Sequence, residues 1–148
     1  MRKFEIVSDQ FRKYGGIDIE LPKRATKGSM AYDFKSPADF NVGAGEIVKI
    51  WTDVKAVMNV GEALLLNVRS SMGGKFMLAN TQGWIDSDYY SNESNDGNIG
   101  IFLKNISDGN INIAKGDKIA QGIFINYLIT DDDDTDTERI GGFGSTGK

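Results

Sequence analysis

Short apolar stretches separated by turns dominate the chain. The four clearest cover residues 46–57, 62–71, 98–106 and 111–126, and they are rich in β-branched and aromatic side chains. Clusters of Gly, Asn, Ser and Asp, such as NVGE, SNDGN and SDGN, lie between these stretches or at their ends. Strands at such regular spacing predict an all-β fold of the sandwich or barrel type.

Helical patterns are nearly missing from the sequence. Residues 70–80 are the one candidate, because Met72, Phe76 and Met77 fall at a loose helical spacing. We therefore expect at most one short helix, and the sequence contains no tandem repeat.

The C-terminal residues differ in composition from the rest of the chain. The last apolar stretch ends near Tyr127, and the acidic run DDDDTDTE is then followed by GGFGSTGK, which carries a single aromatic ring. Like charges and small polar residues leave little that can pack. We expect a β domain over residues 1–130, followed by an acidic hinge and a flexible C-terminal arm over residues 131–148.

Composition limits the size of the domain, its location and the side chains that can act in catalysis. At 148 residues and 40% hydrophobic, the chain has enough material for one domain with a proper core. It has no apolar run near the ~20 residues that span a bilayer, and charges recur through the N-terminal MRKFEIVSDQ, so we expect no membrane partner and a cytoplasmic location. Because Cys and His are both missing, a general base must be Asp, Glu, Lys or Tyr, and a hard ion such as Mg²⁺ is the expected metal.

The charge is unevenly distributed. Residues 1–130 hold equal numbers of basic and acidic side chains, so the net charge of −4 comes entirely from residues 131–148. A neutral body lacks the broad basic surface that binds a nucleic-acid backbone, which disfavours a polymeric nucleic acid as partner. A small anionic ligand held by a few cations remains open.

Four internal stretches contain candidate functional residues: GSMAYDFKS, NVRSSMGGK, ANTQGWIDSDYY and GDKIAQGIF. Taken singly, Asp33 reads as a turn residue, Arg69 as a surface cation, Tyr89 as a packing residue and Gln121 as a polar strand position. The stretch IDSDYY is harder to explain in this way. Its two acids stand in an otherwise apolar run, where burial or a neighbouring charge can tune a base.

Taken together, the stretches resemble one family. ATKGSMAYDF, RSSMGG, NTQGWIDSDYY, GDKIAQGIF and GGFGSTG follow the order and spacing of the five motifs of the homotrimeric deoxyuridine triphosphate nucleotidohydrolases, or dUTPases. The resemblance implies a β jelly roll, a homotrimer with three shared active sites, and hydrolysis of dUTP to dUMP and pyrophosphate. It also implies Mg²⁺ carried in by the substrate triphosphate.

The third motif would supply the general base and the nucleoside pocket. By resemblance, Asp86 takes a proton from the water that attacks the α-phosphorus. Tyr89 packs on the deoxyribose and excludes a 2′-hydroxyl. The backbone at Trp84 and Ile85, with Asn80, reads the edge of the uracil ring.

The second, fourth and first motifs would bind the phosphates. By resemblance, Arg69, Ser70 and Ser71 form the phosphate-binding triplet, and Gln121 also reaches the phosphates. Asp33 matches the acid of the first motif, with an outer-shell role near the metal.

The C-terminal arm would close over the bound nucleotide. Phe143 matches the ring that stacks on uracil, and Gly144 lets the backbone pass close to the base. Ser145 and Thr146 would donate to phosphate oxygens, and Arg139 is the arm's candidate phosphate-binding cation.

The sequence departs from the family pattern in four places. Met30 and Ala31 replace the usual small residue and Gly, Lys118 stands where Arg is common, and Arg139 lies four rather than five residues before the Phe. An insertion covers residues 91–98. Two alternatives to the enzyme stay open: a nucleotide-controlled regulator of another protein, as some phage-encoded members are thought to be, and a dCTP deaminase of the same superfold.

Overall fold

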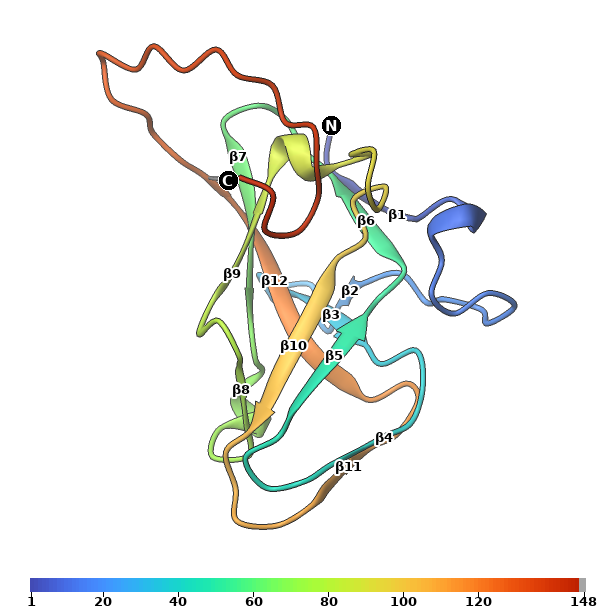
Figure 1. Cartoon of the computed structure of the whole chain (residues 1–148). Helices are drawn as coiled ribbons and strands as arrows, with labels where there is room; N and C mark the ends of the chain where they lie inside the picture. The colour runs from blue at the N-terminus through green and yellow to red at the C-terminus, as the bar shows by residue number, and fades with distance from the viewer. Residues whose placement is uncertain (147–148) are drawn as a thin grey trace.

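The computed structural model describes residues 1–146 and consists of short strands joined by turns and loops (Figure 1). The strands are β1 Lys3–Ile6, β2 Lys23–Arg24, β3 Tyr32–Lys35, β4 Phe40–Val42, β5 Ile47–Trp51, β6 Val54–Val57, β7 Glu62–Asn67, β8 Phe76–Leu78, β9 Gly83–Asp86, β10 Gly100–Asn105, β11 Ile111–Ile113 and β12 Lys118–Asn126. Single 3-10 turns are η1 Asp9–Phe11, η2 Ser70–Met72 and η3 Ser87–Tyr89. The predicted all-β fold is confirmed.

The strands form two main sheets. The larger sheet has the order β2-β3-β12-β7-β9 and the smaller one β5-β10-β8, while β1 pairs with β6 and β11 with β4. Each of these pairs is antiparallel. The sequence order jumps repeatedly between neighbours, so most contacts join segments that are far apart in the chain.

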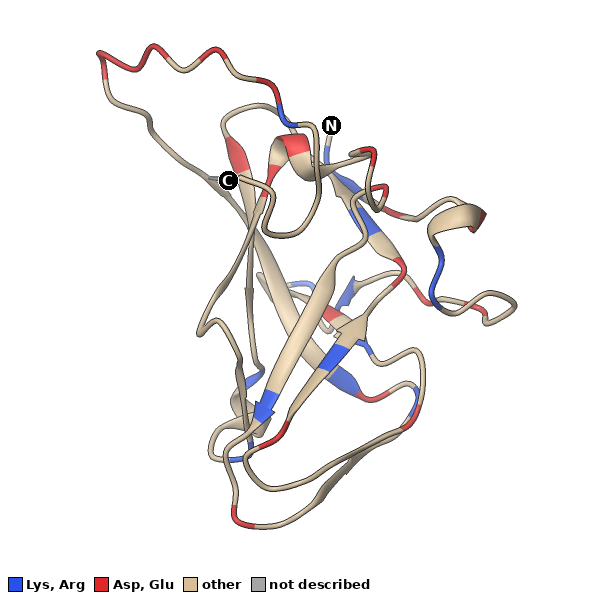
Figure 2. Cartoon of the chain, viewed as in Figure 1, with Lys and Arg blue, Asp and Glu red and all other residues tan. Residues whose placement is uncertain are grey.

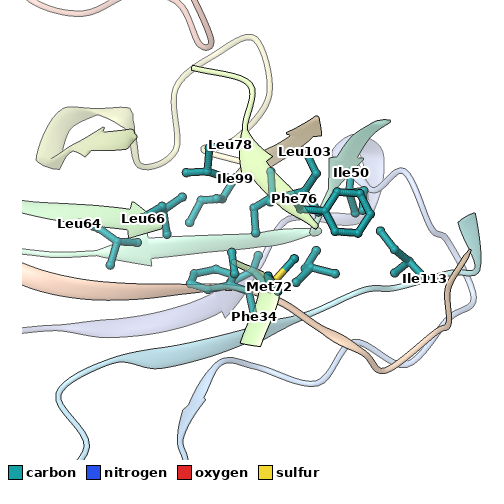
Figure 3. Packing of buried hydrophobic residues seen from close by; sticks show 14 of the residues in the cluster. Phe34, Ile50, Leu64, Leu66, Met72, Phe76, Leu78, Ile99, Leu103 and Ile113 are labelled. Carbon is teal, nitrogen blue, oxygen red and sulfur yellow. The ribbon is translucent and has the colours of Figure 1, made fainter. Parts of the chain in front are cut away.

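The core lies between the two main sheets (Figure 3). Phe34, Leu64 and Leu66 of the larger sheet pack with Ile50 and Leu103 of the smaller one, and none of the five is more than 2% exposed. Buried residues alternate with half-buried or exposed ones along β10, as a strand with one buried face requires. This core fixes the strand ends that carry the candidate site.

Close packing at one glycine joins β12 to its neighbours. A Cβ atom at Gly122 would lie 2.9 Å from Leu66, 3.0 Å from Leu64 and 3.2 Å from Phe34. Any side chain there would force the strands apart. Close packing therefore explains the glycine at position 122, the second of GDKIAQG, without any role in ligand binding.

The region expected to hold a short helix is mostly extended. Only Ser70–Met72 forms a 3-10 turn, and Phe76–Leu78 continues as strand β8. Phe76 and Leu78 are both buried and Leu78 pairs with Leu103, so pairing with β10 is favoured over a second helical turn. The other two 3-10 turns were not expected.

The tail leaves the body after β12. Residues 127–138 are exposed and form no strand or helix, and Figure 2 shows their acidic stretch in red on a loop that extends away from the sheets. The chain then returns to η3 and the end of β9 (Figure 1). Gly147 and Lys148, the last residues of the predicted arm, lie outside the described residues. Among residues 1–146 there is no helix with the length and apolar character needed to cross a membrane.

Candidate active site

A cleft of about 490 Å³ opens where β9 and the turn that precedes it, β10 and the C-terminal arm meet. Its volume falls in the range of small-molecule sites, and its walls are mainly apolar with a few polar groups. It is lined by Leu66, Leu78, Ala79, Asn80, Gly83, Trp84, Ile85, Asp86, Tyr89, Gly100, Ile101, Phe102, Arg139, Gly142, Phe143, Gly144 and Thr146. The cleft thus brings the third and fifth predicted motifs together.

The segment from the end of β8 to the end of β9 forms one wall of the cleft. Pairing with β7 holds β9 in register, with Trp84 opposite Leu65 and Ile85 opposite Leu64. Trp84 is 60% exposed, although it follows a buried strand position. Asn80 lies in the turn before β9. The predicted base-reading residues therefore lie close together on β9 and the turn before it.

Two carboxylates at the end of β9 hold an arginine of the arm. Arg139 Nη2 lies 2.5 Å from Asp86 Oδ2, and its Nε lies 2.8 Å from Asp88 Oδ1. The arginine side chain is only 8% exposed, whereas those of Asp86 and Asp88 are 62% and 57% exposed. The predicted general base is thus paired with the arm and remains open to solvent.

Tyr89 is fixed beneath this ion pair. Its hydroxyl donates to the carbonyl of Asn98 at 2.8 Å and accepts from Nδ2 of Asn95 at 2.7 Å. The guanidinium of Arg139 lies 5.8 Å from the centre of its ring. Burial raises the pKa of the Tyr89 phenol, so this group stays a neutral donor and presents its ring to the cleft.

Phe143 forms part of an aromatic cluster at the mouth of the cleft. Its ring centre lies 5.0 Å from that of Phe102 and 6.0 Å from that of Trp51. The ring remains 55% exposed, which leaves a face available for stacking. Gly144 and Thr146 also line the cleft, while Ser145 is exposed and is not part of its lining.

The other predicted residues gather around a buried carboxylate. Asp33 is 7% exposed, and its two oxygens are bound by Arg69 Nε at 2.9 Å and Lys118 Nζ at 2.7 Å. We call these three residues the Asp33 cluster. Gln121 lies beside it, because β12 pairs Gln121 with Asp33 on one side and with Asn67 on the other.

The serines after Arg69 lie at the surface. Ser70 and Ser71 belong to η2 and are exposed, while the buried side chain of Met72 anchors the turn to the core. Their hydroxyls make no hydrogen bond to another side chain in the described part of the chain. This end of β7 therefore presents hydroxyls beside a cation, as phosphate binding requires.

The cleft and the Asp33 cluster lie at opposite ends of β7. Asp86 pairs with Ala63 near the start of this strand, and Arg69 follows its end. Arg69 lies six positions after Ala63, which at ~3.3 Å per residue is about 20 Å. The expected base and the cation of the Asp33 cluster are therefore well separated within one chain.

Sequence reasoning missed several residues that contact the arm beside the cleft. Asp88 shares Arg139 with Asp86, and its position two residues after Asp86 was the available signal. Trp51, Phe102 and Ser94 contact the arm from distant segments, and no local pattern marks them. No cluster of three carboxylate, His or Cys side chains that could hold a metal occurs among residues 1–146.

Comparison with known proteins agrees with this arrangement. A family model described as dUTPase matches residues 18–147. The chain belongs to the dUTPase family. The deoxyuridine 5′-triphosphate nucleotidohydrolase of Lactococcus lactis subsp. lactis is 40% identical over 151 residues, which cover 99% of this chain and 98% of that protein.

Solved dUTPase structures share the fold. The crystal structure of dUTPase from Streptococcus mutans matches with a TM-score of 0.74 at 38% identity, over 86% of this chain and 98% of that one. A dUTPase from phage phi11 of S. aureus, whose structure describes the coordination of a structural Mg(II) ion, matches with a TM-score of 0.69 at 21% identity, over 93% and 97%. The predicted jelly roll is confirmed by these neighbours.

Proposed function

We infer that this dUTPase hydrolyses dUTP to dUMP and pyrophosphate by attack of water at the α-phosphorus. Family membership supports this conclusion, and the observation that carries it is the cleft itself. The cleft unites the expected base Asp86, the expected sugar-packing residue Tyr89 and the expected stacking ring Phe143. The relatives named above are dUTPases, and nothing in them favours the deaminase or the regulator.

The nucleoside is proposed to bind along β9 and the turn that precedes it. Backbone groups at Trp84 and Ile85, with Asn80, would read the uracil edge, so that cytosine would offer the wrong donor pattern and a thymine methyl would clash. The ring of Tyr89 would pack against the deoxyribose. Because its hydroxyl is already bound by Asn95 and Asn98, the ring cannot retreat to admit a 2′-hydroxyl.

Asp86 is proposed to take a proton from the attacking water. Its side chain is open to solvent, so a water can reach it directly. Arg139 now occupies one carboxylate oxygen, and substrate phosphates would compete for this guanidinium. The bond that forms joins the water oxygen to the α-phosphorus, and the bond that breaks releases pyrophosphate.

The active form is proposed to be a homotrimer. The ~20 Å between the two ends of β7 supports this, since the cleft of one chain then needs the Asp33 cluster of another to complete the site. Arg69, Ser70, Ser71 and Gln121 would bind the phosphates from that second chain. Asp33 would hold the Arg69 guanidinium in place through its buried carboxylate.

Mg²⁺ is proposed to arrive with the triphosphate as part of the substrate. Both oxygens of Asp33 are already bound by cations, and the described residues offer no carboxylate cage. Triphosphate oxygens and water would supply the shell that a small hard ion prefers. Bound in this way, the ion would neutralise phosphate charge. The cytoplasmic location stays a prediction.

Pyrophosphate release tests the proposed function. The purified chain would be given dUTP, dCTP, dTTP or UTP with Mg²⁺, under otherwise equal conditions. We expect release from dUTP, and rates near background from the other three. Equal release from UTP would contradict the role of Tyr89, and no release from dUTP would contradict the function itself.

A further inference from the structure

The inserted segment, residues 91–98, forms a loop that is closed on itself. Asn92 Nδ2 donates to the carbonyl of Tyr89 at 2.8 Å and to Asn95 Oδ1 at 2.7 Å. Its Oδ1 accepts from the backbone N–H and the hydroxyl of Ser94, at 3.1 and 2.8 Å. We call this segment the 91–98 loop. One buried amide thus sets the position of the Ser94 hydroxyl.

A buried ion pair attaches the 91–98 loop to the body. Asp96, which is 8% exposed, lies 2.9 Å from Lys55 Nζ of β6. It also accepts from the backbone N–H and the hydroxyl of Ser8, at 2.7 and 3.0 Å. Since both ends of the loop are fixed, Ser94 is held on a rigid support.

The C-terminal arm contacts the 91–98 loop through its backbone. The N–H of Gly142 donates to Ser94 Oγ at 2.7 Å, and Gly142 is buried although its neighbours on the C-terminal side are exposed. A Cβ atom on Gly142 would lie 2.5 Å from Ser94 Oγ and 3.0 Å from Asn92 Oδ1. The loop therefore fits a glycine at this position of the arm and excludes any larger residue.

The same loop also holds Tyr89. Asn95 Nδ2 donates to the Tyr89 hydroxyl at 2.7 Å, while its Oδ1 accepts from Gly97 N at 3.0 Å and from Asn92. The loop thus touches the arm on one side and the expected sugar-packing ring on the other. Neither contact involves a residue expected to meet the substrate phosphates.

We propose that Ser94 is a positioning residue that latches the arm over the cleft. The proposal rests on the inferred role of the arm in dUTP hydrolysis. Ser94 would fix Gly142, and Phe143, the next residue, would then be placed over the bound base. Ser94 itself touches no reacting group. The contact links two segments, so its effect does not depend on which subunit supplies the arm.

The rate of trypsin cleavage after Arg139 measures how often the arm opens, without relying on enzyme activity. Arg139 is 8% exposed in the closed arm, so cleavage after it requires the arm to open. We would follow loss of residues 140–148 by intact mass for the native chain, Ser94→Ala and Ser94→Thr, with and without Mg²⁺ and a non-hydrolysable dUTP analogue. Loss of one hydrogen bond predicts about 3- to 10-fold faster cleavage for Ser94→Ala. Ser94→Thr keeps the hydroxyl and should behave as the native chain does.

Kinetics and a double variant complete the test. In Ser94→Ala we expect kcat/KM for dUTP to fall by about the same 3- to 10-fold, with an unchanged melting temperature. Gly142→Ala should lower kcat/KM by a larger factor. In the Ser94→Ala background this factor should be smaller, because the 2.5 Å clash with the Ser94 hydroxyl is relieved.

The proposal for Ser94 would be contradicted if Ser94→Ala had the same cleavage rate and the same kcat/KM as the native chain. Fully independent effects of the two substitutions in the double variant would also contradict it. If the native chain released no pyrophosphate from dUTP, the proposed function would fail instead, and the protease rates would still report on the latch.

Discussion

The cleft and the Asp33 cluster differ in how far a single chain encloses them. The cleft has a floor, walls and an arm, and its two carboxylates are solvent-exposed. The Asp33 cluster has two cations on one carboxylate, and a surface-exposed pair of serines in place of an enclosed cavity. One region is shaped for a nucleoside and the other presents cations and hydroxyls for phosphates. The difference supports the proposal that a single chain carries two parts of a site, which meet across a subunit interface of the proposed trimer.

The largest effect is expected in the cleft, at Asp86. Asp86→Asn keeps the size of the side chain and removes its basicity, so kcat should fall by about 100- to 10,000-fold. Steady-state pyrophosphate release measures this. Asp88→Asn is the matched control, since Asp88 also binds Arg139 but is not the expected base. Equal losses in the two variants would show that only the pairing with Arg139 matters.

Removing the arm is expected to come next. Deletion of residues 139–148 removes the Phe143 ring and the arm's hydroxyls, and kcat/KM should fall by about 100-fold or more. The melting temperature should change little, because Phe143 is half exposed and the arm contributes no strand. A large loss of thermal stability would show that the arm belongs to the folded body.

A smaller effect is expected in the Asp33 cluster. Arg69→Ala should lower kcat/KM by about 10- to 100-fold, the usual range for a lost charged hydrogen bond. Arg69→Lys should be intermediate, because it keeps the charge and loses the planar fork. Near-normal turnover of Arg69→Ala would remove this cluster from the site.

The smallest effect on turnover is expected from the anchor of the 91–98 loop. Burial alone would raise the pKa of Asp96, but hydrogen bonds from Ser8 and the ammonium of Lys55 outweigh it and lower the pKa. A lowered pKa gives stability that is present above the ordinary value of 3.8 and is lost as pH falls through the folded-state value.

Asp96→Asn measures this anchor. The variant should lose about 1–3 kcal/mol of unfolding free energy near neutral pH, and the gap to the native chain should narrow between about pH 5 and about pH 3. Denaturant unfolding over this pH range gives the result. A gap that widens as the pH falls would contradict the assigned sign.

The sequence allowed the fold class and several residues that line the cleft to be predicted, because both leave local marks. Alternating apolar strands and turn clusters predicted the sheets, and compact motifs contained Asp86, Tyr89 and Arg69. The order of strands in each sheet leaves no such mark, since it depends on which distant faces pack together. The extended stretch at Phe76–Leu78 shows this, because pairing with β10 outweighed a loose helical spacing.

Contacts between distant segments were the part that sequence could not supply. Arg139 pairs with Asp86, which is 53 positions earlier in the chain. Gly142 donates to Ser94, which is 48 positions earlier. The sequence presented residues 91–98 only as an insertion. Its structural role comes from Asp96 and Lys55, which are 41 residues apart.

Mixing two impaired variants tests the central claim most directly. Asp86→Asn and Arg69→Ala chains would be co-refolded in equal amounts, and pyrophosphate release from dUTP compared with each variant alone. If Asp86 and Arg69 serve one site from different subunits, about a quarter of the sites in randomly mixed trimers hold both native residues, and activity should return to about that fraction of native. If both residues served a site from the same chain, no mixed site would be complete, and the absence of any recovery in well-folded mixed trimers would contradict the account.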